Sequence, residues 1–305
     1  MPDHHTSLKL CRATIVLAAA LLLGGCASAP PIAPWSARAG ADELQKPGPS
    51  PVRDEVLSES IKIGGDDCRG VVERYQPAVA RLQPSIPLIF AHGFLRDVAN
   101  HRDFARHLAS WGVSVYLVGH CSSGWSKSRA DIAGGGAGLL AAMMRQVADA
   151  SGAQRVVYGG FSAGGRASRM AAFADTRTVG WLGLDPVDQI AAGGPPVSFP
   201  MYALFAPAQG CNAQQLGRTL TRSSAAGKAF EVSGTTHCHF EAPTDILCRA
   251  ACGEPGTAAQ NNMLRQRILA LATAFVRWRA ELDGDQAALV WQAYDGVFKE
   301  LVLQP

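Results

Sequence analysis

Short apolar runs alternate with segments of helical spacing through most of the chain. The spacing predicts helices over about 100–110, 139–150, 165–174 and 261–282, the first with a cap at Asp97 or Asn100. Compact apolar runs predict strands at 86–91, 113–118, 155–158, 179–184, 201–206 and 229–233, and a hairpin at 58–63 and 68–75 comes before them. This alternation predicts an α/β fold with a mostly parallel central sheet and helices on both faces.

Composition sets broad limits on the class of protein. Of 305 residues, 48% are hydrophobic and 17% are charged, which is enough apolar material for a sizeable core. The net charge is +3, and no run of Lys and Arg is long enough to indicate nucleic-acid binding. We therefore expect one globular domain over residues 54–305, with its tail at 286–305 unplaced, and no nucleic-acid partner.

Residues 1–25 have the pattern of an export signal. Lys9 and Arg12 precede an apolar run over 13–23, and small residues follow it. This order is typical of a secretory signal peptide, and the run is too short to span a bilayer. Residues 26–53 are rich in Pro, Ala and Gly and have no periodicity, which predicts a flexible tether.

The end of this signal, Leu23-Gly24-Gly25-Cys26, resembles the lipobox of bacterial lipoproteins. The resemblance implies cleavage before Cys26 and attachment of palmitate-like acyl chains to its sulfur and amine, which anchor a protein stably to a membrane. Similar lipoproteins that carry Ala at the next position, as here at Ala27, are sent to the outer membrane. We expect a lipid-anchored envelope protein that faces the periplasm; an ordinary signal peptide with a chance cysteine is the alternative.

The remaining cysteines agree with export. An even number in an oxidising compartment suggests disulfides, although six cysteines allow 15 pairings. A zinc site is the alternative, but the paired C-x₂-C spacing that zinc sites favour is missing, so no metal is expected. The cysteines concerned are Cys68, Cys121, Cys211, Cys238, Cys248 and Cys252.

The segment Gly160-Phe161-Ser162-Ala163-Gly164 lies between a predicted strand and a predicted helix. Gly-x-Ser-x-Gly in this setting describes a nucleophile elbow. Such a turn strains the serine backbone and leaves no room for side chains beside it, which explains both glycines. Ser162 would stand exposed at the sheet edge, with the Ala163 amide at a helix N-terminus ready to stabilise an anion. A glycine-rich turn with a chance serine is the alternative.

A serine nucleophile needs a base, and the base needs an orienting acid, in the chain order Ser, acid, His. No Asp or Glu occurs over 189–230, which leaves Asp185 or Asp188, just past the strand 179–184. We favour Asp185, because a short carboxylate at the strand tip is held rigidly; Asp188 fits a plain turn. The base is His237 or His239, and we favour His237, which is nearer the strand end.

Other residues near these segments have less specific roles. Phe94, Trp125 and Phe161 are candidate pocket walls, although core aromatics would look the same in sequence. His101 and His107 fall in the predicted helix 100–110, where we expect them on the surface. The connection over 186–200 is short and rich in Gly and Pro, so no large lid is expected over the pocket.

Taken together, these motifs resemble the α/β-hydrolase superfamily. The resemblance is carried by residues 160–164, His92-Gly93-Phe94, Gly183-Leu184-Asp185-Pro186 and His237, and it covers about residues 58–282. The acid in Gly-Leu-Asp-Pro is similar to that of neutral lipases and plant chlorophyllases, which have His-x-Asp where this chain has His237 and His239. The resemblance implies an α/β-hydrolase fold and an oxyanion hole formed by the amides of Phe94 and Ala163.

The sequence thus favours a carboxylic-ester hydrolase that needs no cofactor. Ser162 would attack the carbonyl of a small-molecule or lipid-like ester, His237 would take and return the proton, and Asp185 would stabilise the imidazolium. Two other classes stay open. One is a catalytically idle fold that binds an envelope component, and the other is an acyltransferase with an acceptor other than water.

Overall fold

A computed structural model describes residues 41–63, 66–78, 86–119, 136–188 and 195–282. The strands are β1 (Val52–Ile63), β2 (Asp66–Pro77), β3 (Leu88–Ala91), β4 (Val115–Val118), β5 (Val156–Phe161), β6 (Thr178–Leu184), β7 (Met201–Phe205) and β8 (Lys228–Glu231). The α-helices are α2 (Ala41–Leu44), α3 (Arg102–Ser110), α5 (Gly136–Ala150), α6 (Ala163–Ala174), α7 (Ile246–Cys252) and α8 (Ala258–Arg279). Three further segments are 3₁₀-helical: η1 (Val98–His101), η2 (Gly210–Ser223) and η3 (His237–Phe240).

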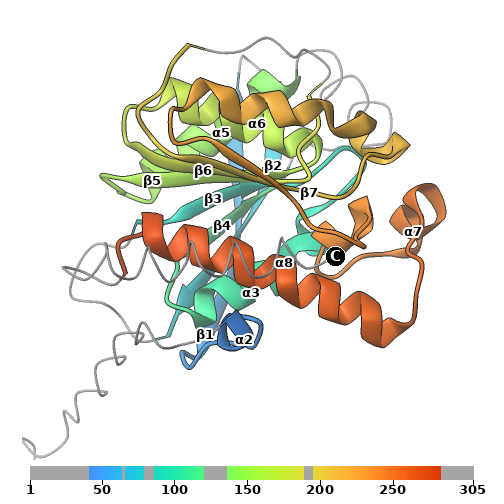
Figure 1. Cartoon of the computed structure of the whole chain (residues 1–305). Helices are drawn as coiled ribbons and strands as arrows, with labels where there is room; N and C mark the ends of the chain where they lie inside the picture. Colours follow the sequence, from blue (N-terminus) through green and yellow to red (C-terminus); the bar gives the residue numbers. More distant parts are fainter. Residues whose placement is uncertain (1–40, 64–65, 79–85, 120–135, 189–194, 283–305) are drawn as a thin grey trace, which may run out of the picture. The chain divides into compact units, whose positions relative to one another are not determined.

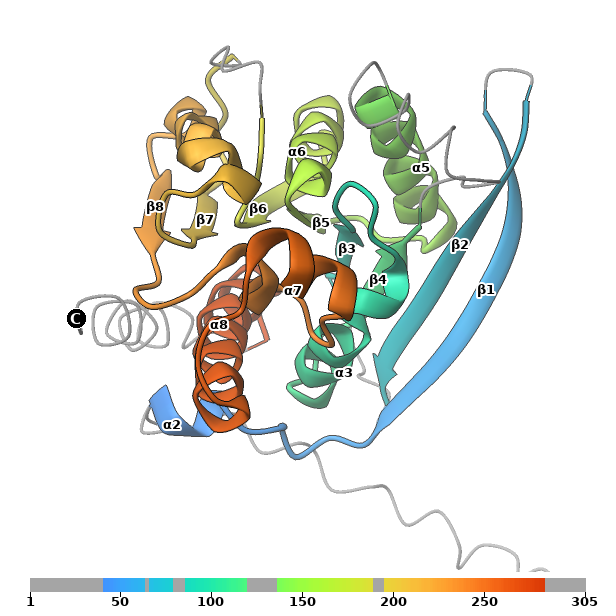
Figure 2. The ribbon, with the colours of Figure 1, turned by 90° about the vertical axis from the view of Figure 1, so that its right-hand side faces the viewer.

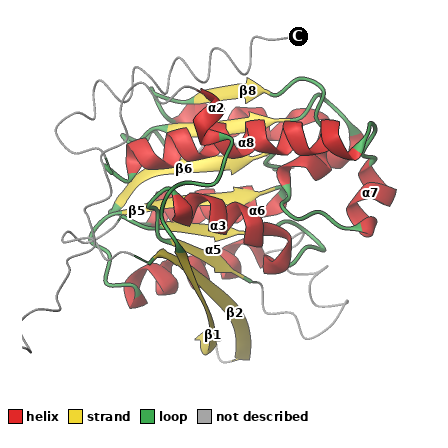
Figure 3. Cartoon of the chain, turned by 90° about the horizontal axis from the view of Figure 1, so that it is seen from below, coloured by secondary structure: helices red, strands yellow, loops and turns green. Residues whose placement is uncertain are grey.

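The eight described strands form one mostly parallel sheet, which confirms the predicted α/β class. Their order is β1-β2-β4-β3-β5-β6-β7-β8. Strands β3 to β8 pair in parallel, whereas β1 and β2 form the predicted antiparallel hairpin, and β2 pairs antiparallel with β4. Sheet twist turns β1 and β2 well away from the direction of β8 (Figure 3).

Successive strands are added to the sheet on opposite sides of β3, so the strand order reverses there. From β3 it passes through α3 to β4 on one side, and from β5 it proceeds through β6 and β7 to β8 on the other. Right-handed crossovers then require α3 on one face and α5 and α6 on the opposite face. Figure 1 shows this arrangement, with α8 on the same face as α3. In such sheets ligands bind beyond the carboxyl ends of the strands where the order reverses, here β3 and β5.

Each face of the sheet carries its own apolar core. Phe104 and Phe275 belong to the core under α3 and α8, and Met144 and Trp181 belong to the core under α5 and α6. Every residue of β3, β4 and β5 is buried, as their continuous apolar runs predicted. These two cores fix the central strands from both sides and so hold their carboxyl ends in place.

The predicted flexible tether is wrong for its last part. Residues 41–51 pack on the domain: Leu44 is fully buried, and α2 lies against α8 (Figure 2). The carbonyl oxygen of Lys46 accepts a hydrogen bond from Trp111 Nε1 at 2.9 Å, and the Ser50 amide donates to the Ser110 carbonyl oxygen at 3.0 Å. Composition missed this docking because it depends on one leucine and on backbone atoms.

Several predictions fall outside the described residues. These are the signal over 1–25, the lipidation site Cys26, the pocket candidate Trp125 and the tail at 286–305. The centre of the 186–200 connection, for which no large lid was expected, also lies outside them. No helix in the described part of the chain is long and apolar enough to cross a membrane.

The prediction that His101 and His107 lie on the surface is also wrong. His101 is fully buried between the rings of Phe90 and Phe161, and neither of its nitrogens has a hydrogen-bond partner among the described residues. His107 is buried too, and its Nε2 lies 3.0 Å from the Leu44 carbonyl oxygen. Burial lowers the pKa of both imidazoles, that of His107 to about 4. Helical periodicity could not show that residues 41–51 cover a second side of α3.

Acid should destabilise the folded protein through His107. Between pH 6.5 and pH 4 the unfolded chain binds a proton on this residue and the folded protein does not, so the free energy of unfolding falls as the pH falls. A pKa difference of this size corresponds to about 3 kcal/mol. Urea unfolding at pH 7 and pH 4 measures how much the free energy of unfolding falls between these pH values. In His107→Gln we expect this fall to be smaller than in the wild type by about that amount. Equal losses in wild type and variant would contradict this assignment.

Candidate active site

Ser162 occupies the sharp turn between β5 and α6. Its backbone has φ 53° and ψ −124°, a strained conformation for a residue with a side chain. Its amide donates to the Leu184 carbonyl oxygen at 3.0 Å, and its own carbonyl oxygen accepts from the amides of Gly165 and Val187, both at 2.9 Å. The expected strand–turn–helix around the serine is therefore present, and hydrogen bonds from β6 and α6 hold it.

Two glycines make this turn possible. A Cβ on Gly160 would lie 2.2 Å from the Gly164 carbonyl oxygen, and a Cβ on Gly164 would lie 2.3 Å from the His92 carbonyl oxygen. Neither position has room for a side chain, as the motif predicted. The loop after β3 also approaches closely, since a Cβ on Gly93 would come within 2.8 Å of the Ser162 Cβ. The segment before Phe94 therefore lies directly against the serine.

Parallel register places Asp185 level with Ser162. Phe161 pairs with Leu184 at the ends of β5 and β6, so the two functional candidates are the next residues on neighbouring strands. Asp185 is fully buried and has φ 42°, and its amide donates to the Leu204 carbonyl oxygen of β7 at 2.7 Å. The predicted position of Asp185 at the strand tip is confirmed.

His237 meets this carboxylate. Its Nδ1 lies 2.7 Å from Asp185 Oδ2, so an ionised Asp185 places the proton on Nδ1 and leaves Nε2 as the acceptor. The imidazole packs on the Phe161 ring at 4.5 Å between centroids. Because Phe161 directly precedes Ser162, the structure brings the serine, the acid and the histidine to one end of the sheet.

The rival candidates have other partners. His239 Nδ1 accepts from the Thr236 amide at 2.9 Å, and its Nε2 lies 3.1 Å from Asn261 Oδ1 on α8. Asp188 Oδ1 lies 3.6 Å from Arg166 Nε, in α6. Both histidines belong to the 3₁₀ segment η3. The preference for His237 over His239 agrees with this geometry, because His237 is the histidine that contacts the Asp185 carboxylate.

Phe161 was predicted as a pocket wall, and this is wrong. Its side chain is 1% exposed and lies between the rings of His101 and His237. The Phe161 ring therefore packs against the His237 ring inside the core. Of the two proposed oxyanion donors, Ala163 is the first residue of α6, where an amide has no acceptor within the helix. Half-buried Phe94 directly follows Gly93.

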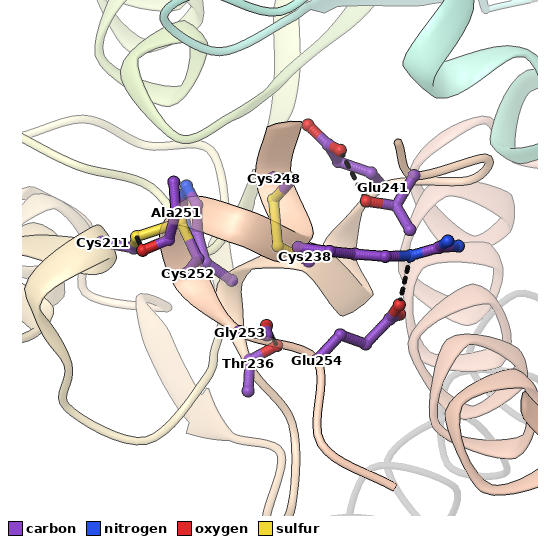
Figure 4. The surroundings of a disulfide bond; sticks show 12 residues. Cys211, Thr236, Cys238, Glu241, Cys248, Ala251, Cys252, Gly253 and Glu254 are labelled. Atoms are coloured by element: carbon purple, nitrogen blue, oxygen red, sulfur yellow. Dashed lines mark hydrogen bonds and ion pairs between the residues drawn. A yellow bond between two sulfur atoms is a disulfide. The ribbon is translucent and has the colours of Figure 1, made fainter. Parts of the chain in front are cut away.

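Two disulfides lie beside the loop that carries His237 (residues 235–241, the histidine loop), and Figure 4 shows them side by side. One joins Cys238, next to His237, to Cys248, and the other joins Cys211 to Cys252. The sulfur atoms of Cys238, Cys248 and Cys252 lie within 4.8 Å of one another because the bridges are adjacent. Disulfides are thus confirmed for these four cysteines. Cys121 and the side chain of Cys68 lie outside the described part.

A buried ion pair that sequence analysis missed joins the loop after β3 to the histidine loop. Arg96 contacts Glu241 through two hydrogen bonds, one of them from Nη2 to Oε2 at 2.8 Å, and also pairs with Asp245 at 2.8 Å. Burial raises the pKa of the fully buried Glu241, while Arg96 opposes the rise. No sequence signal could have identified a pair whose members are 145 residues apart.

Comparison with known proteins found no matching family model and no matching curated sequence. The interpretation of this site therefore depends on its own geometry.

Proposed function

We propose that this protein is a carboxylic-ester hydrolase of the α/β-hydrolase type. The observation that carries the proposal is the hydrogen bond from His237 Nδ1 to Asp185 Oδ2 at the same sheet edge as the strained Ser162. The nucleophile sits on a strand-to-helix turn, and the three residues follow in the order Ser, acid, His, as in α/β-hydrolases. The mostly parallel sheet supports the same assignment.

The chemistry follows from the roles of the three residues. Ser162 Oγ attacks the ester carbonyl while His237 Nε2 takes its proton, and Asp185 stabilises the resulting imidazolium. The amides of Phe94 and Ala163 stabilise the tetrahedral oxyanion. His237 then gives the proton to the departing alcohol, which leaves an acyl-serine. Water, deprotonated by the same histidine, releases the acid and restores the enzyme.

Two observations favour this function over an idle binding fold. Backbone strain at Ser162 and at Asp185 is costly, and strain of this kind concentrates at functional sites. A buried carboxylate is also costly unless it is hydrogen-bonded, and this one holds an imidazole in the orientation needed by a base. Hydrolysis and acyl transfer pass through the same acyl-enzyme and differ in the acceptor. Hydrolysis releases an acid and acyl transfer forms a new ester, so analysis of the products separates the two reactions.

We further propose that the domain is tethered to the bacterial envelope through a lipidated Cys26. The Leu-Gly-Gly-Cys motif at 23–26 supports this location. The two disulfides support it independently, because structural disulfides persist in oxidising compartments such as the periplasm. Lipid-like esters would be within reach of a protein held at a membrane, and small soluble esters would be as well.

Replacing the nucleophile should abolish ester hydrolysis. In Ser162→Ala we expect no turnover of short-chain p-nitrophenyl esters and no covalent labelling by a fluorophosphonate probe, while the Tm stays nearly unchanged. His237→Ala should be about as damaging, and the double variant should lose little more, because the residues act as a unit. Comparable turnover in wild type and Ser162→Ala would overturn the assignment.

The two candidate acids should differ sharply. Asp185→Asn should lower kcat by about 10⁴-fold, because the amide favours the wrong imidazole tautomer. Asp188→Asn is the matched control, since it changes a neighbouring carboxylate that pairs with Arg166, and it should retain most of the activity. Steady-state kinetics on purified variants compares them. A reversed order of damage would contradict the role given to Asp185.

Lipidation should depend on Cys26. In Cys26→Ser we expect no incorporation of labelled palmitate during growth, with the protein left as precursor or as an otherwise processed species without the lipid. Ester hydrolysis should persist, because Cys26 lies outside the domain that carries Ser162, Asp185 and His237. Equal labelling of wild type and variant would exclude this cysteine as the anchor.

A further inference from the structure

Asp185 contacts His237 through Oδ2 only. Its other carboxylate oxygen, Oδ1, accepts a hydrogen bond from a buried amide side chain. Asn212 Nδ2 donates to Asp185 Oδ1 at 3.2 Å, and the Ala206 amide donates to the same oxygen at 3.1 Å. Asn212 is itself fully buried. We propose that Asn212 is a positioning residue, which fixes the carboxylate so that Oδ2 faces His237. This inference rests on the proposed function.

The orientation of the Asn212 amide follows from its surroundings. Its Oδ1 accepts from the backbone amides of Gln209 at 2.9 Å and Gln215 at 3.2 Å. Its Nδ2 faces the carbonyl oxygens of Ala206 at 3.2 Å and Pro207 at 3.1 Å, in addition to the carboxylate. A flipped amide would direct its oxygen at three acceptors and its nitrogen at two donors. Asn212 must therefore present a donor to Asp185.

An unusual backbone conformation follows Asn212. Ala213, Gln214 and Gln215 have φ of 48°, 56° and 59°, three successive left-handed residues without a glycine. Such strain persists only where the surrounding structure imposes it, and it concentrates at functional sites. On the other side of Asn212, the Cys211–Cys252 disulfide ties the chain to the end of α7 (Figure 4). The side chain is thus held from both directions.

Two donors on one oxygen restrict the carboxylate in the way a triad acid requires. With Oδ1 fixed, rotation about the side-chain bond is blocked, and Oδ2 stays 2.7 Å from His237 Nδ1. Losing the Asn212 donor would leave the Ala206 amide alone on Oδ1, and the imidazole would be held less firmly in its productive orientation.

Gln215 offers a matched control within the same turn. Its side chain bonds to the Ala206 carbonyl oxygen and to Glu231 Oε2, the latter at 2.8 Å, and it makes no hydrogen bond to Asp185 among the described residues. Gln215→Ala therefore weakens the turn and spares the donor. Asn212→Asp keeps the turn and removes the donor. One carboxylate oxygen can still accept from the two backbone amides, while the other replaces the Nδ2 group that donates to Asp185.

The experiment compares Asn212→Asp, Asn212→Ala and Gln215→Ala in the full mature chain. We expect both Asn212 variants to lower kcat on a short-chain ester, and the rate of fluorophosphonate labelling, by about 100-fold with KM nearly unchanged, which is the effect of a misplaced catalytic group. Gln215→Ala should stay within about threefold of wild type. Asn212→Asp at wild-type rate, or Gln215→Ala as slow as Asn212→Ala, would overturn the inference.

A second measurement tests the contact between Asn212 and Asp185 without using enzymatic activity. It applies even if the Asn212 variants fail to fold or the wild type is inactive. In ¹H–¹⁵N NMR spectra, the Asn212 side-chain amide signals should shift in Asp185→Asn, where a neutral group replaces the charged acceptor, and should not shift in Asp188→Asn. Unchanged signals in Asp185→Asn would overturn the positioning role. A wild type that does not react with the fluorophosphonate overturns the proposed function instead, and the NMR result still decides the Asn212–Asp185 contact.

Discussion

The hydrogen bond between His237 Nδ1 and Asp185 Oδ2 joins segments that are 52 residues apart, and much of the carboxyl edge of the sheet is arranged around it. Asp185 is fully buried, so its charge requires partners. The described residues supply three: the imidazole, the Ala206 amide and the Asn212 side chain. The Cys238–Cys248 disulfide and the pair between Arg96 and Glu241 then hold the opposite member, the histidine loop. The two sides of the contact are therefore fixed independently of each other.

The strained backbone at the ends of β5 and β6 is kept in place by the apolar cores on the two faces of the sheet. Ser162 and Asp185 both have positive φ, an unfavourable conformation for residues with side chains. Each directly follows a strand whose last residues are buried by helices on both faces. A turn can be kept in such a conformation only where the flanking segments cannot relax. The double-sided core is therefore a condition of the site as well as of the fold.

Sequence identified the parts of this site that depend on local patterns. Gly160 and Gly164 indicate the elbow because the turn excludes side chains, and the buried strands are visible as continuous apolar runs. The acid was found because the carboxylates after the elbow are few. The order of these features along the chain also predicted a mostly parallel sheet, because the predicted strands from 86–91 to 179–184 are separated by predicted helices that return the chain.

Features that depend on long-range packing could not be predicted. Asn212 follows no motif, and its left-handed turn contains none of the glycines that usually indicate one. The pairing of Cys211 with Cys252 requires knowing that η2 lies beside α7. His101 was placed on the surface because periodicity describes one face of a helix, whereas the sheet covers this residue through Phe90 and Phe161.

The docking of residues 41–51 has a consequence for where the domain can work. With a lipid on Cys26, only residues 27–40 separate the anchor from α2, and a fully extended chain of that length spans at most about 50 Å. A chain free as far as β1 would have spanned about 90 Å. If Cys26 is lipidated as proposed, the first packed helix, and not the first strand, would set the greatest distance between the membrane surface and the folded domain. Under that proposal, a substrate would have to come close to the membrane surface before the domain could reach it.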